Sequence, residues 1–451
     1  MAVYSGLCLM ILLAPPQARV ADTAARAPAL GKSAAASAHA PPPAETLEFA
    51  WQAALAADRR LEGEQYSASA AYEQLQAVKA RRWTRVDLEA SYTARSDEPR
   101  FRLHLPGVPL SNDLTPLMQD ENFAARAAFE MPLYTSGRIS HTIDAASSEA
   151  LAAALQYEDA TVDVKMEVAE VFVGVLRAQR ELAVRETAVR NLDSYFCDVA
   201  QRFQHQQVPK HDLLRAQVAL ADARQGAIEA RNALDIARAA YNRYLGRPLT
   251  YPVRLAEAPW SAPGESVDEL TAAARGNRRQ LARLDAETRA LRHQAESLRA
   301  SNRPQVHLRG EYSFEENRYR EPEGIAALGV GVSWNVFDSG STRHEAASLA
   351  HRAESLLRLK ADLLSRIELD VRRRWLDVQQ AQRRLEVTPQ AIDQAEENLR
   401  VVRKRYFLGT ATNTEVLDAE TLRTRAYRNH HHAAYDAVLA VLRLRHATGR
   451  L

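Results

Sequence analysis

A tandem repeat is the feature that most restricts how this chain of 451 residues can fold. At an offset of 220 residues, the segment VDLEASY (86–92) aligns with VHLRGEY (306–312). At an offset of 203 residues, PLYTSGR (132–138) aligns with NVFDSGSTR (335–343). Because the offsets differ by 17 residues, the first copy must have the longer loop between these two landmarks. Both halves of the chain therefore carry the same succession of elements.

Each copy contains two segments in which apolar and polar residues alternate. These segments cover residues 85–94 and 122–132 in the first copy, and 305–315 and 325–336 in the second. Alternation over about ten residues predicts strands with one apolar and one polar face, as in outer-membrane proteins. Because even the smallest closed barrels need about eight strands, four strands predict a barrel shared by several chains. A soluble hairpin packed on a helix is the competing interpretation.

A long helical segment follows each second strand, and a shorter one returns. The long helices are predicted over 138–207 and 342–407, and the return helices over 210–245 and 412–447. Apolar residues recur at three- and four-residue spacing along the long segments, which indicates packed helices. At ~1.5 Å per residue, a helix of this length reaches roughly 100 Å. The predicted fold class is therefore mainly α with a small transmembrane β part.

The flanking segments differ in composition from the repeats. Residues 1–27 start with a short apolar run and contain the small-x-small pattern Ala25-Arg26-Ala27, which predicts a signal peptide for export. The remaining divisions are an Ala/Pro-rich linker at 28–45, the first copy at 46–250, a second linker at 251–265 and the second copy at 266–451. The mature chain would keep one cysteine, Cys197, so no internal disulfide is expected.

Composition and motifs exclude several classes of function. The formal net charge is only +2, which gives no electrostatic reason to expect a nucleic-acid partner. Beyond the signal peptide no run of about 18 apolar residues occurs, so strands would have to cross any membrane. No catalytic or nucleotide-binding motif is present, so we expect neither enzyme activity nor a cofactor. The run His430–His432 points around a helix, and no metal site is predicted.

From Thr46 to the C-terminus, the chain resembles the TolC family of outer-membrane efflux and secretion proteins. The resemblance rests on the turns PLYTSGR and NVFDSGSTR, with bends at Gly137 and Gly340, and on the segment ASNRPQVHLRGEYS. Two tip sequences, RFQHQQVPKHDLLRAQ and RYFLGTATNTEVLDAE, also carry it. The resemblance implies a homotrimer with twelve strands in one barrel and a periplasmic tunnel of helices. It also implies a passive exit duct that meets an adaptor protein and an inner-membrane transporter.

The resemblance further implies roles for residues at the two tips. The positions that match the family's aperture, where side chains constrict the pore or bind cations, are Tyr406, Asp212, Glu415 and Asp418. The positions that match the turns meeting the adaptor are Arg202, Phe203 and Val208 in the first tip, and Arg405, Leu408, Gly409 and Thr410 in the second. The chain departs from the family at Gln206, which replaces the usual glycine, and at Ala411, where a basic gate residue can stand.

Structural roles compete with the functional ones at three tip positions. Thr412 and Glu415 have the spacing of a capping box, which satisfies free backbone N–H groups at the start of a helix. Asp418 lies near the same helix start, where an acidic residue is favourable. Gly409 fits a helix C-cap that needs a positive φ.

These observations together predict an outer-membrane duct that extends into the periplasm and serves efflux or type I secretion. The alternative is a periplasmic coiled-coil adaptor or scaffold without channel activity. That alternative accounts for the helices and leaves the alternating strands unexplained.

Overall fold

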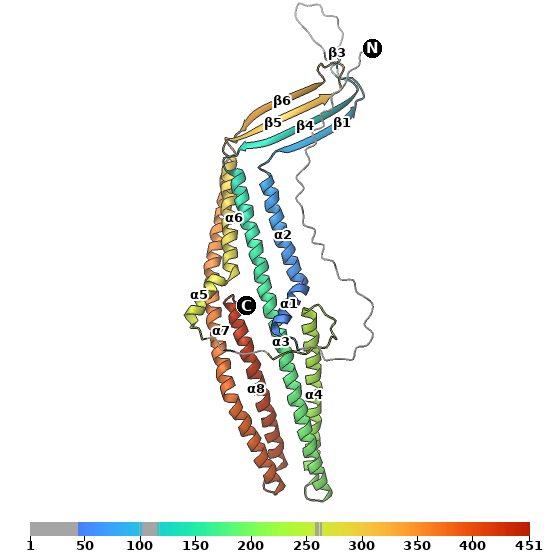
Figure 1. The fold of residues 1–451 in the computed structure, drawn as a ribbon, viewed down its shortest axis with the longest axis vertical. Coiled ribbons are helices and arrows are strands. Elements are labelled where there is room, and N and C mark those ends of the chain that lie inside the picture. Colours follow the sequence, from blue (N-terminus) through green and yellow to red (C-terminus); the bar gives the residue numbers. More distant parts are fainter. Residues whose placement is uncertain (1–43, 99, 102–114, 117, 258–260, 262–263) are drawn as a thin grey trace, which may run out of the picture. The chain divides into compact units, whose positions relative to one another are not determined.

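Two helices of 67 residues each, α3 (Arg138–Gln204) and α7 (Ser341–Phe407), are the longest elements of the computed structural model (Figure 1). The structure describes residues 44–98, 100–101, 115–116, 118–257, 261 and 264–451. The predicted signal peptide and residues 28–43 of the first predicted linker lie outside the described residues. From Ala44 onward the chain belongs to one unit.

Four strands form one antiparallel sheet in the order β1-β4-β5-β6. Their bounds are β1 (Arg85–Ala94), β4 (Glu121–Tyr134), β5 (Gln305–Glu315) and β6 (Gly324–Ser333). Each copy of the repeat supplies one hairpin, so the predicted four strands and internal duplication are confirmed. Within the described residues, β1 and β6 each pair on one side only and form the two edges of the sheet.

The hairpins differ in their connections and ends. The connection between β1 and β4 spans 95–120 and contains the short pair β2 (Arg100–Phe101) and β3 (Thr115–Pro116), whereas β5 and β6 are joined by 316–323 only. β6 ends at Ser333, although the alternation predicted a strand to residue 336. The reason is that Ser333 pairs with Gln305, the first residue of β5, so later residues have no partner strand.

The strand register collects the apolar side chains on one face of the sheet. Phe129 of β4 lies opposite Val86 on one side and opposite Gly310 on the other. A Cβ at residue 310 would lie 2.1 Å from the ring of Phe129, so any other residue there would force this ring to move. Leu88 and Leu328 are 81% and 73% exposed, so nothing in the described chain covers this face.

The opposite face of the sheet carries charged side chains in pairs. Arg126 contacts Glu311 at 2.7 Å, and Arg309 contacts Glu130 at 3.4 Å. Both pairs join β4 to β5 and are largely exposed, and such pairs stabilise a fold only weakly. Their consequence is a face suited to water, opposite a face suited to lipid.

A glycine turn connects each second strand to its long helix. Gly137 and Gly340 have φ values of 91° and 85°, a region that other residues enter only with strain, and each is the N-cap of its helix. In the second turn, Asp338 accepts hydrogen bonds from the N–H groups of Gly340 (2.9 Å) and Thr342 (3.0 Å). Hydrogen bonds from Thr342 and Asn302 hold the pKa of Asp338 well below its usual range.

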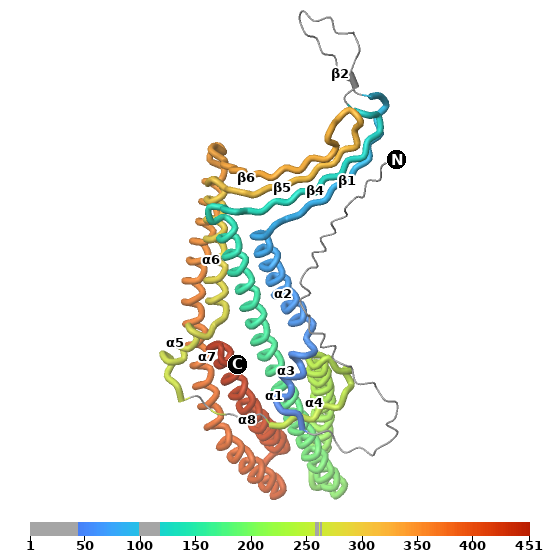
Figure 2. The backbone as a smooth tube through the Cα atoms, turned by 45° about the horizontal axis from the view of Figure 1, so that its top comes forward, coloured from blue at the N-terminus to red at the C-terminus, as the bar shows by residue number. Residues whose placement is uncertain are grey.

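The remaining helices pack along the two long ones (Figures 1 and 2). α4 and α2 pack on α3, α8 and α5 pack on α7, α1 packs on α3, and α6 packs on both long helices. Their bounds are α1 (Leu47–Ala57), α2 (Arg59–Ala80), α4 (Lys210–Tyr244), α5 (Val267–Asn277), α6 (Arg279–Ser301) and α8 (Asn413–Ala447). Of the described helices, none combines the length and apolar character required to cross a membrane.

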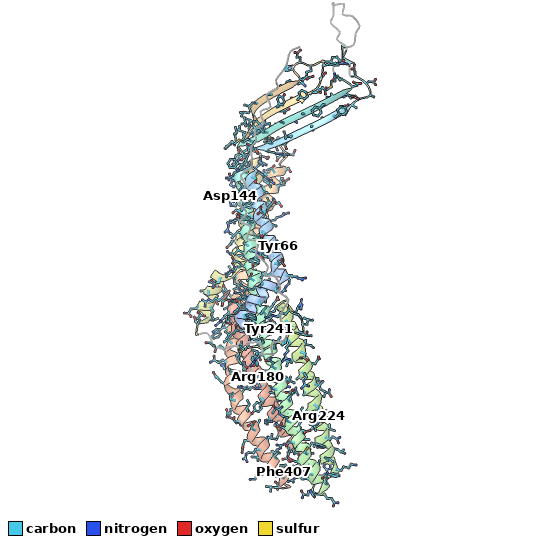
Figure 3. The ribbon with its side chains drawn as sticks, turned by 45° about the vertical axis from the view of Figure 1, so that its right-hand side comes forward. Tyr66, Asp144, Arg180, Arg224, Tyr241 and Phe407 are labelled. Atoms are coloured by element: carbon cyan, nitrogen blue, oxygen red, sulfur yellow. The ribbon has the colours of Figure 1, made fainter. Side chains whose placement is uncertain are left out.

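Two apolar cores lie where the short helices meet the long ones. In the first, Phe172 of α3 contacts Tyr241 of α4 at a ring-centroid distance of 6.1 Å, and Trp51 of α1 donates a hydrogen bond to the carbonyl of Lys165 at 2.8 Å. Figure 3 shows Tyr241 midway along the helices, between Asp144 near the sheet and Phe407 near the tips. The second core packs α5 and the end of α8 against α7 around Val371.

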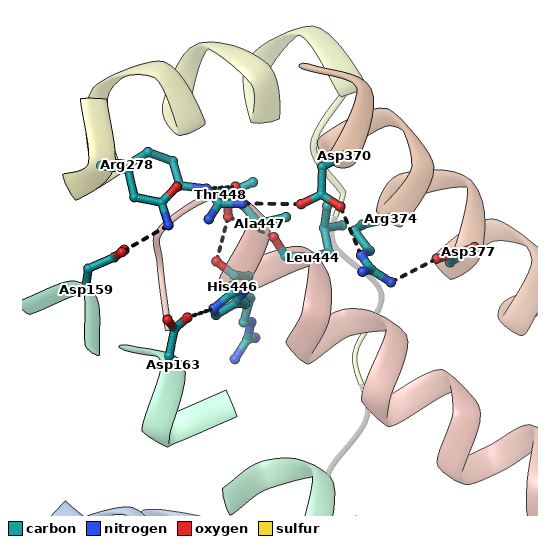
Figure 4. A network of polar contacts seen from close by, with 12 residues as sticks. Asp159, Asp163, Arg278, Asp370, Arg374, Asp377, Leu444, His446, Ala447 and Thr448 are labelled. Carbon is teal, nitrogen blue, oxygen red and sulfur yellow. Dashed lines mark hydrogen bonds and ion pairs between the residues drawn. The ribbon is translucent and has the colours of Figure 1, made fainter. Parts of the chain in front are cut away.

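A polar network ties the end of α8 to the break between α5 and α6 (Figure 4). Arg278, at that break, donates from Nε to the carbonyl of Ala447 (2.9 Å) and from Nη2 to Asp370 of α7 (3.2 Å). His446 contacts Asp163 of α3 at 2.8 Å. The network therefore joins α3, α7 and α8 to one another and to the break between α5 and α6.

We expect Arg278→Ala to lower the free energy of unfolding by about 1.5–3 kcal/mol, because the side chain makes two bonds and one goes to a carboxylate. Arg275→Ala is the matched control, since Arg275 forms an exposed pair with Glu368 at 2.6 Å and should contribute under about 1 kcal/mol. Thermal unfolding in detergent, followed by helical circular dichroism, measures both. Equal losses would contradict the role assigned to Arg278.

Candidate aperture at the helical tips

The turns that join α3 to α4 and α7 to α8 have the same backbone geometry. In the first turn, the N–H groups of Gln207 and Gln206 bond to the carbonyls of Arg202 and Phe203, both at 2.9 Å. In the second, the N–H group of Thr410 bonds to the carbonyl of Arg405 at 2.9 Å, and the N–H group of Gly409 bonds to the carbonyl of Tyr406 at 3.0 Å. This pair of bonds is the Schellman motif, which satisfies the last free carbonyls of a helix. Because the motif ends α3 at Gln204, the helix stops short of residue 207.

The two turns satisfy the same conformational requirement with different residues. Gly409 has a φ of 72°, and Gln206, at the equivalent place, has a φ of 57°. A residue with a side chain is strained in this left-handed region by roughly 1–2 kcal/mol. The first tip therefore keeps the motif without the glycine.

An apolar cluster joins the two helical hairpins behind the turns. Its members come from all four helices of the tips and are buried. They are Tyr195, Val199, Ala216, Leu399, Val402, Tyr406, Val416 and Ala419, which we call the tip cluster. The rings of Tyr195 and Tyr406 lie 6.0 Å apart at its centre.

Three buried hydrogen bonds cross between the hairpins within this cluster. The Tyr406 hydroxyl donates to Asp212 Oδ2 at 3.2 Å, which joins α7 to α4. The Tyr195 hydroxyl donates to Asn413 Oδ1 at 2.7 Å, which joins α3 to α8. The amide of Asn413 in turn donates to the carbonyl of Asp212 at 2.8 Å. Separating the hairpins would leave these buried groups without partners, which is costly.

The environment keeps both phenols protonated. Burial, followed by the negative charge of Asp212, raises the pKa of Tyr406 to about 12. Burial also raises the pKa of Tyr195. Both side chains therefore remain hydrogen-bond donors at neutral pH.

The structure brings together two of the four predicted aperture residues. Tyr406 and Asp212 are in contact and buried, as described above. Glu415 instead accepts a hydrogen bond from the N–H of Thr412 at 3.1 Å and completes the capping box of α8, and this bond lowers its pKa. Asp418 is exposed, and its carboxylate makes no hydrogen bond or ion pair with the residues that the structure describes.

The predicted adaptor-contact residues of the first tip are half-buried. The guanidinium of Arg202 lies 4.3 Å from the ring centroid of Phe407 and donates to the Phe407 carbonyl at 3.3 Å, so it also joins the hairpins. Phe203 and Val208 flank the turn, and Val208 packs on the tip cluster. Arg202 thus contributes to the contact between the two helical hairpins, a role that the sequence did not indicate.

The adaptor-contact residues of the second tip are exposed. Arg405 donates to the Thr410 carbonyl at 2.9 Å and lies 3.9 Å from Glu415, which closes the turn on itself. Leu408 is 70% exposed, and Gly409 is exposed beside it. The second tip therefore has an exposed apolar side chain, Leu408, on its surface.

Sequence reasoning missed polar residues that are buried between the helices. Glu420 is only 4% exposed and accepts hydrogen bonds from Asn191 and Arg423, both at 3.1 Å. Asn413 is 2% exposed. Both fall at three- and four-residue spacing from Val416, so a polar interruption of the α8 apolar stripe was the pattern that could have identified them.

A sheet with one exposed apolar face, joined to two long helical hairpins that meet at their tips, defines a TolC-type outer-membrane protein. A model of the outer membrane efflux protein family matches residues 50–247 and 270–450. The chain belongs to this family, and membership places it in the bacterial outer membrane with its helices in the periplasm.

Similar proteins share this architecture at low sequence identity. Alkaline protease secretion protein AprF of Pseudomonas aeruginosa is 24% identical over 316 residues, which span 67% of this chain and 65% of AprF. Among solved structures, the outer-membrane channel OprN is 19% identical with a TM-score of 0.77 over 90% of each chain. VceC of Vibrio cholerae is 18% identical with a TM-score of 0.76 over 89% of this chain and 96% of VceC.

The two turns provide a matched pair of substitutions. Gln206→Gly should raise the free energy of unfolding by about 1 kcal/mol, because it removes the left-handed strain of a side chain. Gly409→Ala should lower it by about 1–2 kcal/mol; the space beside Gly409 is open, so only the backbone conformation opposes a side chain. Thermal unfolding of the detergent-solubilised chain measures both. A destabilising effect of Gln206→Gly would contradict the claim that the Gln206 backbone is strained.

Proposed function

We propose that this chain is the outer-membrane component of a tripartite efflux pump or a type I secretion system, a passive exit duct formed by three copies. The observation that carries the proposal is the sheet, whose two edges are unpaired in the described chain and whose exposed apolar face has no cover. In one isolated chain, the edges would be unstable in a lipid bilayer and the apolar face would be unstable in water.

A barrel closed by three copies pairs the sheet edges and turns the apolar face toward lipid. Backbone N–H and C=O groups in lipid must be paired, so β1 of one chain pairs with β6 of the next until the barrel closes. Three copies of a four-stranded sheet supply about twelve strands, above the minimum of about eight for a closed barrel. The apolar face then meets lipid, and the face with the Arg126–Glu311 and Arg309–Glu130 pairs lines the water-filled interior.

The helical tips form the closed end of the duct in this proposal. The Tyr406–Asp212 bond and the tip cluster hold the hairpins of one chain together. Opening requires the hairpins to separate, which breaks these contacts. The duct is therefore closed in its resting state and opened by a partner that offers compensating contacts.

The partners proposed are a periplasmic adaptor and an inner-membrane transporter. The adaptor meets the tip turns, where Leu408 offers an exposed apolar contact. AprF is named for the secretion of alkaline protease, and this likeness favours protein export as a second candidate beside efflux of small molecules. A passive duct performs no chemistry, so we propose no enzyme activity and no cofactor, and its cargo is selected by the transporter.

A periplasmic adaptor or scaffold without channel activity is the alternative. It would use the helices and leave the amphipathic sheet without a role. Recovery of the chain in the soluble periplasmic fraction, without heat-modifiable mobility on a gel, would favour that alternative and exclude the duct.

Loosening the hairpin contact should open the duct. In planar lipid bilayers, we expect the wild-type chain to form channels of low conductance and Tyr406→Phe to raise the conductance, because the bond to Asp212 is lost. Tyr427→Phe is the control: Tyr427 bonds to Glu396 at 2.6 Å within the α7–α8 hairpin and does not join the two hairpins. Equal conductance for Tyr406→Phe and wild type would exclude this bond from closure.

Asp418 supplies a separate test of the aperture. Three symmetry-related carboxylates at the tip would bind multivalent cations and block the pore, so Asp418→Ala should weaken the block of single-channel conductance by such cations. Asp268→Ala, at an exposed position on α5 away from the tips, should leave the block unchanged. An unchanged block in Asp418→Ala would assign Asp418 to the outer surface of the helix.

A further inference from the structure

We propose that His141, Asp144 and His293 form a binding site for a divalent transition-metal ion of the Zn²⁺ type between α3 and α6. His141 and Asp144 lie one turn apart at the start of α3, a spacing that puts them side by side on the helix surface. His293 comes from α6, which packs along α3. Figure 3 shows Asp144 on the part of the bundle next to the sheet.

The geometry brings one ligand atom from each side chain into a common space. These three atoms all lie within 4.8 Å of one another. The two imidazole rings are stacked, with centroids 5.8 Å apart and an angle of 26° between their planes. Zn²⁺ bonds of ~2.0–2.1 Å place ligand atoms ~3.3 Å apart, so small side-chain rotations complete the site without backbone movement.

Among the residues that the structure describes, none gives these three side chains another polar partner. The Nδ1 atom of His141 is buried and lacks a hydrogen bond. The imidazole of His293 and the carboxylate of Asp144 likewise make no hydrogen bond or ion pair with the part of the chain that the structure describes. A buried ring nitrogen without a partner is costly, and a metal ion bound through that nitrogen would satisfy it.

The donor set determines the class of ion. Two imidazoles and one carboxylate suit Zn²⁺ and its transition-metal neighbours, whereas Ca²⁺ and Mg²⁺ prefer oxygen ligands only. Three protein ligands leave one tetrahedral position, which water would fill. Because His141 and Asp144 are far from His293 in the sequence, no ligand spacing reveals the site, and the sequence predicted none.

The second copy of the repeat provides an internal comparison. His344 follows Gly340 by four residues, as His141 follows Gly137, and each ring lies near the glycine of its turn. The position that matches Asp144 is Ala347, so the second copy lacks the carboxylate. The site is therefore specific to the α3–α6 contact, and its consequence is a cross-link between these helices beside the sheet.

The test is zinc binding to the purified full-length chain, prepared without an affinity tag and stripped with a chelator. His431→Ala and Cys197→Ser are introduced first as a common background, because the run His430–His432 and the exposed thiol of Cys197 could hold zinc elsewhere. Titration against a chromophoric chelator gives stoichiometry and affinity. We expect about one tight equivalent per chain, and thermal unfolding at higher temperature when zinc is added.

Three variants decide the outcome. The double variant His141→Asn, His293→Asn should lose the tight equivalent and the zinc-dependent thermal shift, and Asp144→Asn should weaken affinity by about tenfold or more. His344→Ala, the matched control from the second copy, should keep both. Unaltered zinc stoichiometry in the double variant would overturn the site, as would the absence of tight zinc in the background protein. Channel conductance is not used as a readout, so failure here leaves the proposed duct untouched.

Discussion

The two sheet edges that are unpaired within the described residues are the constraint on which the rest of this molecule depends. β1 and β6 present backbone N–H and C=O groups on the outer sides of the sheet, and the hydrocarbon of a bilayer offers these groups no partner. The same sheet exposes an apolar face that water does not favour. Edge-to-edge pairing of copies of the chain satisfies the backbone groups, and insertion of the closed barrel into lipid covers the apolar face. The helices that continue from β4 and β6 are then arranged around the same axis, so barrel closure also creates the proposed tunnel.

The strand-to-helix turns set the direction in which α3 and α7 leave the sheet toward the periplasm. Gly137 and Gly340 take up the positive φ at the start of α3 and α7, and the hydrogen bonds to Asp338 stabilise the second turn. Beyond the turns, α6 contacts both long helices, and the network around Arg278 fixes the C-terminal end of α8. The chain is thus held together firmly near its middle and near the sheet.

The tips differ from the rest of the bundle in how they are held. Their four helices meet through one apolar cluster, the contact of Arg202 with Phe407 and three buried hydrogen bonds that include Tyr406 and Asp212. Such contacts are strong while intact and are lost together when the hairpins part. A metal ion bound by His141 and His293 would stabilise the opposite end of α3, and so would favour movement at the tips over movement beside the sheet.

The sequence by itself determined the elements that depend on local pattern. Alternation and the repeat located four strands, and apolar stripes at three- and four-residue spacing located the long helices. The spacing of Thr412 and Glu415 identified a capping box that the structure contains. Local patterns also indicated the glycine bends. The helices α1, α2, α5 and α6 were not predicted, because no strand or tip sequence indicated them.

Only the tertiary structure decided which distant residues meet. The bond between Tyr406 and Asp212, the burial of Asn413 and Glu420, and the approach of His293 to His141 all join separate helices. Their distances depend on how helices are rotated about their axes, and rotation is set by packing across the whole bundle. The positive φ of Gln206 has a different cause: the hydrogen-bond motif that closes the turn outweighs the local preference of the residue.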